Sequence, residues 1–186
     1  MVNDDSGMSG PFERFRSRQG RTGPLRASRI HAVSGGGSLW MGGVNSVSGS
    51  PIDPKQLDGA HVIDCAGELP DAFRHSAALW SQCYFADVRS SPAQFARIKQ
   101  LASIAARDLE HGDVLVFCRF GNNRSGLVAG LTLRELGFSG QEAIVAIRSK
   151  RPGALANLDF LDLVATYRPS VVDEERPSEE PDSAGE

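Results

Sequence analysis

The chain has 186 residues, of which 40% are hydrophobic and 23% are charged, and its formal net charge is −3. This composition provides a core for one domain, and the small net charge excludes bulk attraction to nucleic acid or to a membrane surface. No stretch approaches the roughly 20 apolar residues of a membrane span, and the first residues lack the apolar segment of a signal peptide. We therefore expect a cytoplasmic protein that does not bind membranes.

The two ends of the chain carry opposite charge. Residues 13–31 contain six arginines and one acid, whereas residues 173–186 contain seven acids and one arginine. Both ends are rich in Ser, Gly or Pro and poor in periodic apolar residues, which is typical of segments that do not fold. We expect a mobile Arg-rich arm over 1–28, a folded domain over 29–168 and a disordered acidic tail over 169–186. Solvated ends without a partner are favoured over a docking arm.

The three cysteines contain no C-x-x-C pair, so they predict neither a zinc site nor a disulfide framework. The four histidines are scattered without the spacing of metal ligands. We expect no metal and no cofactor. Unpaired cysteines also fit a reducing cytoplasm.

The first half of the domain contains four short segments that are typical of strands. The turn at 35–37 joins the first two, and Pro70 breaks any helix near the start of an irregular connection over 66–81. The expected strands, in chain order, are 29–33, 38–41, 61–65 and 82–86.

The second half alternates helices with one buried strand at 114–117. Helix boundaries are marked by four features: Ser91 as a cap with Pro92 at the first helical position, a helix from Arg124 to Gly137, the capping box Ser139 to Glu142, and Asn157 as the cap of a last helix through Tyr167. This order of elements predicts one three-layer α/β domain. We expect a mainly parallel sheet of about four to five strands with helices on both faces.

The stretch DVLVFCRFGNNRSG, Asp113 to Gly126, carries the clearest chemistry. A buried strand ends at Cys118, a loop with a central glycine follows, and a helix begins at Arg124. Successive backbone N–H groups and a helix N-terminus point at one spot in such a loop, so it binds an anion and favours the thiolate form of the cysteine. The expected phosphate-binding residues are Arg119, Phe120, Gly121, Asn122, Asn123 and Arg124.

Two side chains of this stretch have predicted catalytic roles beside the nucleophile Cys118. Arg124 offers a planar fork that can bind two phosphate oxygens, and Ser125 can place a hydroxyl against the sulfur and help it leave. The spacing C-x5-R by itself is weak evidence, because Cys83 and Arg89 also match it. That second match has no central glycine and no helix after its arginine.

Asp87 is the candidate general acid. It follows the strand expected at 82–86 and precedes Cys118 by 31 residues with one helix between them, which places both residues at the carboxyl ends of neighbouring parallel strands. A carboxylic acid there can protonate a leaving oxygen and later accept a proton from water. The alternative is an ordinary turn residue before Ser90.

The run CRFGNNRSG, followed by LVAGLTLRELGFSGQEAIVAIRSKRPGAL, resembles the cysteine-dependent tyrosine and dual-specificity phosphatases, in particular the compact type and its bacterial relatives. The similarity covers 38–167 and is most specific over 113–160. It implies metal-independent hydrolysis of phosphomonoesters through a cysteinyl phosphate, with a phosphorylated protein or peptide as substrate. The family has its general acid at a spacing similar to that of Asp87.

The resemblance bears on three further positions. The family usually has a histidine before the cysteine, which braces the loop and supports the thiolate, whereas this chain has Phe117. In the family an asparagine at the position of Asn157 hydrogen-bonds toward the phosphate loop, and helix capping is the equal alternative. In some relatives a cysteine near the position of Cys65 forms a reversible disulfide with the nucleophile, although burial as a core residue is favoured here.

Three other functions stay open. A phospho-binding pseudophosphatase would keep the loop without turnover, and Phe117 favours it. An RNA 5′-phosphatase is an alternative, because Gly121 to Gly126 also resembles the loop of RNA triphosphatases and the Arg-rich arm could follow an RNA backbone. A phosphoinositide phosphatase is disfavoured, because the loop lacks additional lysines.

Overall fold

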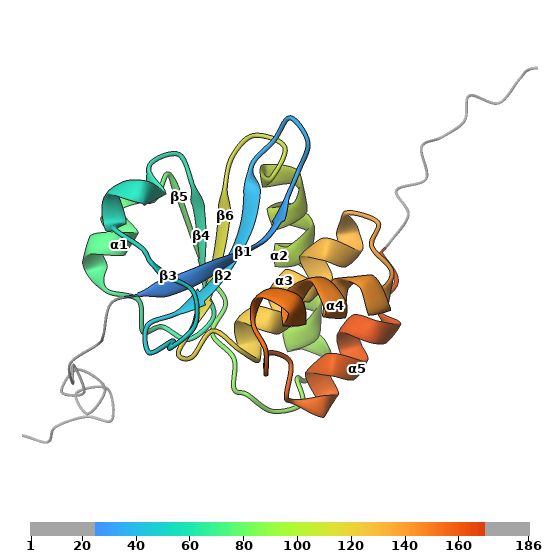
Figure 1. Ribbon diagram of the computed structural model, residues 1–186. Helices are drawn as coiled ribbons and strands as arrows, with labels where there is room; N and C mark the ends of the chain where they lie inside the picture. The colour runs from blue at the N-terminus through green and yellow to red at the C-terminus, as the bar shows by residue number, and fades with distance from the viewer. Residues whose placement is uncertain (1–24, 170–186) are drawn as a thin grey trace, which may run out of the picture.

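A six-stranded sheet crosses the middle of the molecule in the order β3-β1-β2-β6-β4-β5 (Figure 1). The computed structural model describes residues 25–169, so the expected arm and tail lie outside the described residues apart from 25–28 and 169. The strands are β1 (Arg26–Ala32), β2 (Ser38–Gly43), β3 (Ser50–Pro51), β4 (His61–Asp64), β5 (Leu79–Gln82) and β6 (Val114–Cys118).

The central part of the sheet is parallel. Strands β2, β6, β4 and β5 run in one direction, whereas β1 pairs antiparallel with both β2 and β3. The prediction of a mainly parallel α/β sheet is therefore confirmed, with six strands in place of four or five. The additional strand is β3, which has only two residues and is too short to produce an alternating pattern in the sequence.

Helices cover the sheet unevenly (Figure 1). Helices α2 to α5 lie on one face, where α2, α3 and α4 bury apolar side chains in the larger core. The other face is covered by α1 and a short 3-10 helix, which contribute Phe73 and Leu57 to a smaller core. The helices are α1 (Asp71–Ser76), α2 (Pro92–Asp108), α3 (Arg124–Glu135), α4 (Gly140–Lys150) and α5 (Leu158–Thr166).

The three predicted helix caps are confirmed. The Ser91 hydroxyl accepts a hydrogen bond from the backbone N–H of Gln94 at 3.3 Å. The capping box of Ser139 and Glu142 is complete in both directions. The Asn157 side chain accepts from the first N–H groups of α5. Local sequence was sufficient here because a cap depends on residues at most three positions apart.

Two predictions for the segment between β4 and α2 are wrong. Residues 66–81 are not irregular throughout, because α1 begins directly after Pro70, a residue that suits the start of a helix since it needs no backbone N–H. The strand expected at 82–86 lies at Leu79–Gln82, where it pairs with β4 over its whole length. Asp87 is therefore five residues beyond a strand end, and that strand is not a neighbour of β6 as expected, because β4 lies between them. At the other end of the domain, β1 begins at Arg26, three residues earlier than expected.

Within 25–169, no helix has both the length and the hydrophobicity that crossing a membrane requires.

Candidate active site

In the loop between β6 and α3, the backbone carbonyl groups accept hydrogen bonds from other described residues, whereas the backbone N–H groups donate none. None of the backbone N–H groups from Arg119 to Asn123 donates a hydrogen bond to another described residue. The carbonyl oxygens of Cys118 to Asn122 all accept one, from Val44 N at 3.3 Å, Asn45 N at 2.8 Å, Arg151 Nη2 at 3.3 Å, Arg151 Nε at 2.8 Å and Leu155 N at 3.3 Å, in that order. Five consecutive N–H groups on one loop, without a partner among the described residues, can together bind an anion.

Glycines allow this loop to lie against β2. Gly121 has a φ of +69°, and a Cβ atom there would lie 2.5 Å from the carbonyl carbon of Gly42 and 2.7 Å from Arg151 Nη2. A Cβ atom on Gly43 would lie 2.5 Å from the carbonyl carbon of Phe120. The close approach thus depends on the absence of side chains on both the loop and the strand.

Cys118 lies at the bottom of the loop and is 4% exposed. Its Sγ lies 3.3 Å from the Oγ of the buried Ser125. Arg124 is the first residue of α3, and its half-buried guanidinium has no hydrogen bond or ion pair with another residue of the described range. The structure thus brings the predicted nucleophile and its hydroxyl partner together, and it leaves the guanidinium able to bind an added anion.

Two asparagines fix Asp87 over the same loop. Asn123 Nδ2 donates to Asp87 Oδ2 at 2.9 Å, and Asn157 Nδ2 donates to Asp87 Oδ1 at 2.9 Å and to its backbone carbonyl at 3.2 Å. The asparagines are also joined to each other, because the backbone N–H of Asn157 donates to Asn123 Oδ1 at 3.1 Å. The irregular segment after β5 therefore reaches the loop that follows Cys118, although Asp87 does not end a strand.

The outer part of the loop carries an aromatic and a charged side chain. Phe120 is 55% exposed, and the Arg119 guanidinium lies 5.6 Å from the centre of its ring. Arg119 also lies 3.7 Å from Glu68, whose segment borders the loop. The Arg119 side chain thus has partners at the rim of the loop.

Phe117 and Cys65 both belong to the cores beneath the loop. Phe117 is fully buried in the smaller core, and its ring occupies the space above Gly42. Cys65 follows β4 and is bound to the neighbouring strand, because its backbone N–H donates to the Phe117 carbonyl at 2.8 Å. Its thiol is free, and burial, together with the nearby Cys118, raises its pKa well above the ordinary value.

Sequence reasoning missed three features of this site. Arg151 was not selected, because it follows Arg148 and Lys150 in a charged helix end that resembles a solvated surface. Glycines 42 and 43 lie beyond the strand expected at 38–41, and their contact with the loop has no local signal in the sequence. Asn123 was expected to bind phosphate through its backbone, and its side-chain bond to Asp87 joins residues 36 positions apart. The spacing in the sequence contains no signal for such long-range contacts.

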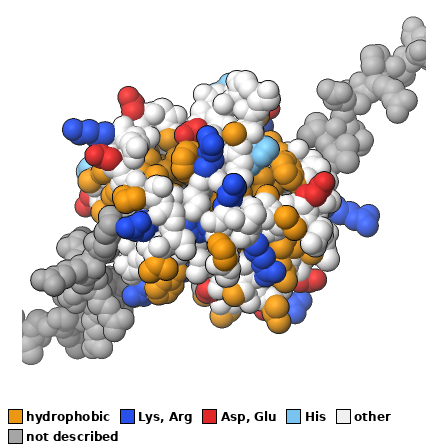
Figure 2. Space-filling model, viewed as in Figure 1, with side chains coloured by type: hydrophobic (Ala, Val, Ile, Leu, Met, Phe, Trp, Pro, Cys, Tyr) orange, Lys and Arg blue, Asp and Glu red, His pale blue; other side chains and the backbone are white. Residues whose placement is uncertain are grey.

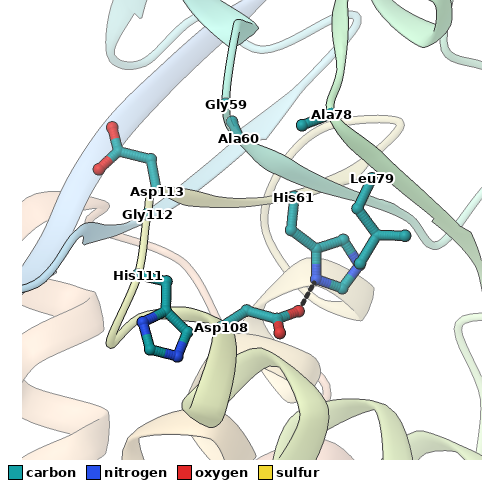
Figure 3. A pocket seen from close by; sticks show the side chains of 9 residues that line it. All are labelled: Gly59, Ala60, His61, Ala78, Leu79, Asp108, His111, Gly112 and Asp113. Carbon is teal, nitrogen blue, oxygen red and sulfur yellow. Dashed lines mark hydrogen bonds and ion pairs between the residues drawn. The ribbon is translucent and has the colours of Figure 1, made fainter.

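A cavity of about 180 Å³ lies at the opposite edge of the sheet, where the parallel strands begin. Its lining includes His61, Asp108, His111 and Asp113, and Figure 3 shows the bond between the first two. His61 Nδ1 lies 2.6 Å from Asp108 Oδ2, and His61 Nε2 lies 2.8 Å from the hydroxyl of Ser81 on β5. This arrangement joins the end of α2 to the edge of the sheet.

Comparisons with known proteins give the fold. No model of a known protein family matches the chain, and no curated protein matches it. Among solved structures, human DUSP28 has 17% identity and a TM-score of 0.57, covering 74% of this chain and 94% of its own. Tk-PTP in its active form has 22% identity and a TM-score of 0.52, covering 75% and 96%.

A third structure carries a substitution in its own site. Kinase associated phosphatase, with its catalytic-site cysteine replaced by serine, has 16% identity and a TM-score of 0.56, covering 77% of this chain and 94% of its own. These matches have low sequence identity and nearly complete coverage of the known domains. The chain therefore has the fold of the cysteine-dependent tyrosine and dual-specificity phosphatases.

Proposed function

We propose that this protein hydrolyses phosphomonoesters through a phosphorylated Cys118. The observation that carries the proposal is the set of five unbound N–H groups from Arg119 to Asn123 around the thiol at the end of β6. These donors, together with the Arg124 guanidinium, would bind the three non-bridging oxygens of a phosphoryl group. The solved neighbours with this fold, among them kinase associated phosphatase, support the same class of reaction.

In the first step, the Cys118 thiolate attacks phosphorus in line with the leaving oxygen. The new S–P bond forms as the P–O bond of the ester breaks, and Asp87 donates a proton to the leaving oxygen. The loop donors hold the phosphoryl oxygens as their charge shifts, and they need no reorganisation because the carbonyls behind them are already bound.

In the second step, a water molecule attacks the cysteinyl phosphate. Asp87 accepts a proton from that water, the S–P bond breaks, and Ser125 donates a hydrogen bond to the departing sulfur at the position where its Oγ lies 3.3 Å away. Inorganic phosphate leaves, and Asp87 is protonated for the next cycle. Asn123 and Asn157 would keep the Asp87 side chain over the loop in both steps.

The serine variant of the nucleophile tests the mechanism. We expect Cys118→Ser to lose turnover of p-nitrophenyl phosphate while binding inorganic phosphate with nearly the affinity of the wild type, because the donors of the loop remain. Cys83→Ser is the matched control, since Cys83 is another buried free cysteine of the described chain that lies outside the loop. Turnover in Cys118→Ser equal to that of Cys83→Ser would refute the proposal.

A binding protein without turnover is the second candidate, and Phe117 is the observation that favours it. Its buried ring cannot donate a hydrogen bond to the loop, as the histidine at this position in the resembled family would. The same measurement separates the two functions. A wild-type protein that binds phosphate and phosphopeptide but releases no phosphate from any substrate would be a phospho-binding module.

A phosphorylated protein or peptide is the proposed substrate, and RNA with a 5′-phosphate is the alternative. On the face shown in Figure 2, the Lys and Arg side chains are separated by other surface and form no continuous basic stripe, which supports the former. Release of phosphate from phosphotyrosine and phosphothreonine peptides, an inositide and 5′-triphosphate RNA should be compared, with Cys118→Ser as the blank. Faster release from the RNA would reverse this preference.

Two further proposals concern the thiols. The buried free cysteines of the described chain support a reducing, cytoplasmic location. Cys65 could form a disulfide with Cys118 after peroxide oxidises the nucleophile to a sulfenic acid, which Cys65 would attack with loss of water. Mass spectrometry after mild peroxide should then find the Cys65–Cys118 peptide. If only singly oxidised Cys118 is found, Cys65 is a core residue without this role.

A further inference from the structure

Arg151 is a buried cation without a buried anion to match it. It caps the C-terminal end of α4 and is 1% exposed, and no carboxylate of the described residues forms an ion pair with it. Its guanidinium instead donates to backbone carbonyls and hydroxyls. The acceptors are the carbonyls of Gly121, Phe120, Met41 and Ser48 and the hydroxyls of Ser28 and Ser46.

These contacts join the phosphate loop to the antiparallel side of the sheet. Arg151 Nε lies 2.8 Å from the Gly121 carbonyl, and Nη2 lies 3.3 Å from the Phe120 carbonyl. The other bonds anchor the same guanidinium on β1, on β2 and on the segment that follows β2, including one of 2.6 Å to Ser46 Oγ. A planar group with five N–H donors reaches these six acceptors when one N–H is shared, whereas an ammonium group with three donors cannot.

The carbonyl contacts determine where the N–H groups point. In a trans peptide the C=O and the following N–H are directed to opposite sides. A guanidinium that holds the Phe120 and Gly121 carbonyls at the back of the loop therefore directs the N–H groups of Gly121 and Asn122 to the front. Both N–H groups belong to the set that has no partner in the described chain.

The charge of Arg151 acts at the same place. Burial lowers the pKa of this guanidinium, and proximity to Cys118 opposes that shift. An anion in the loop, either the thiolate or a bound phosphate, would balance the charge. Phe117 cannot contribute to this balance, because its side chain is apolar and lies in the smaller core.

We infer that Arg151 is a positioning residue of the phosphate loop: it turns two N–H groups toward the anion and supplies a second fixed positive charge behind it. The inference rests on the proposed function. It assigns to Arg151 the support of the loop that, in the resembled family, a histidine at the position of Phe117 usually provides. The ionisable groups around the loop also include Arg119 and Arg124 within it, Glu68 beside Arg119, Asp87 across it, Asp64 at the end of β4 and Cys65 directly after that strand.

Substitutions of two arginines in the same helix end separate this role from general stability. Arg151→Met removes the charge and the fork, and Arg151→Lys keeps the charge alone. Arg148→Met is the matched control, because Arg148 also donates to two backbone carbonyls, those of Ala154 and Leu155, and makes no bond to the phosphate loop. Thermal unfolding should be recorded for all three variants.

Two measurements report on the loop without requiring turnover. The first is the affinity for inorganic phosphate in the Cys118→Ser background. The second is the rate at which iodoacetamide alkylates Cys118 in the otherwise wild-type chain, followed on the Cys118 peptide at pH 6 and at pH 10. Because only the thiolate reacts, the comparison of the two pH values separates the charge effect from access to the sulfur.

We expect Arg151→Met to bind phosphate about tenfold more weakly or worse, since at least one donor of the anion site is lost. Alkylation at pH 6 should slow by about tenfold while the rate at pH 10 stays the same. Arg151→Lys should keep most of the pH 6 rate but bind phosphate about threefold more weakly, because its charge remains and its fork is lost. Arg148→Met should match the wild type in both measurements.

Wild-type phosphate affinity and an unchanged pH 6 to pH 10 ratio in Arg151→Met would overturn the inference. If Arg151→Met does not fold, Arg151→Lys decides, and wild-type phosphate affinity in that variant overturns it. The proposed function fails in a different way. A wild type that binds phosphate but does not hydrolyse p-nitrophenyl phosphate would contradict the function and leave these binding comparisons valid.

Discussion

The two edges of the parallel sheet differ in how their polar groups are satisfied. At the edge where the strands begin, both ring nitrogens of His61 have partners, and Asp113 accepts from the Ser38 N–H at 2.7 Å and from Trp40 Nε1 at 3.0 Å. At the edge where the strands end, five backbone N–H groups after Cys118 have no partner in the described chain.

This difference supports the proposal that a ligand binds at the edge where the strands end. The edge where the strands begin has the cavity of about 180 Å³, but His61 and Asp108 are already bound to each other there and join α2 to the sheet (Figure 3). Asp113 is bound to β2 through Ser38 and Trp40. The loop edge presents a preformed set of donors. Such a run of donors is a better sign of an anion site than the volume of a cavity.

The largest expected effect comes from adding a side chain at Gly121, where the loop packs against β2. Gly121→Ala should lower kcat/KM by about 10²-fold to 10³-fold, as expected when donors of an oxyanion site are displaced, because the methyl group would meet the Gly42 carbonyl. Gly35→Ala is the control: its φ is also positive, at +75°, and nothing lies within 4 Å of an added Cβ atom. Equal losses in the two variants would show that backbone strain alone is responsible.

Removing the proton donor should have the next largest effect, and its size should depend on the leaving group. Asp87→Asn should lower kcat by about 10²-fold for an alkyl phosphate and by less for p-nitrophenyl phosphate, whose leaving group needs less protonation. Asp162→Asn, in the exposed part of α5, is the control. A loss of the same size for both substrates would remove Asp87 from the role of general acid.

A smaller effect should separate the two bonds of Asn157. Asn157→Ser retains an acceptor for capping α5 but cannot reach Asp87, whereas Asn157→Ala loses both contacts. We expect both variants to lose activity by about tenfold, the order of one hydrogen bond to a charged group. Only the alanine variant should also lose about 1 kcal/mol of unfolding free energy, measured with urea. Full activity in the serine variant would leave Asn157 as a helix cap alone.

Substitutions at the edge where the parallel strands begin should change the stability of the protein and not its activity. Burial lowers the pKa of His61, and this outweighs the contrary effect of Asp108. In the unfolded chain His61 has its ordinary pKa of about 6.5, so it binds a proton more tightly there than in the folded chain. The stabilisation that neutral, buried His61 gives the folded state is complete above pH about 6.5. It is lost as the pH falls through the lowered pKa of His61 in the folded state.

Thermal unfolding between pH 8 and pH 5 measures this effect. The melting temperature of the wild type should fall toward pH 5, and the fall should be smaller in His61→Gln. His111→Gln is the control, because His111 lines the same cavity and its side chain has no hydrogen bond to another described residue. Equal slopes in wild type and His61→Gln would show that another group controls acid stability, and a lower kcat in His61→Gln at pH 8 would show that the two edges are coupled.

Sequence alone was sufficient for the features that depend on neighbouring residues. The three caps at Ser91, Ser139 and Asn157, the buried strand ending at Cys118 and the helix starting at Arg124 all follow from patterns within a few positions. The α/β class followed from the order of these elements. The loop after Cys118 was predicted in the same way, because a strand, a glycine loop and a helix are consecutive in the chain.

Tertiary structure decided what depends on contacts between distant residues. The end of β5 at Gln82 is set by pairing with β4, and the partners of Asp87 lie 36 and 70 positions away. Arg151 holds the loop carbonyls from 30 and 31 positions further along the chain, although in sequence it resembles a surface arginine. Hydrogen bonds of this kind have no period and no spacing, so only the packed fold determines which polar groups are satisfied and which remain for a ligand.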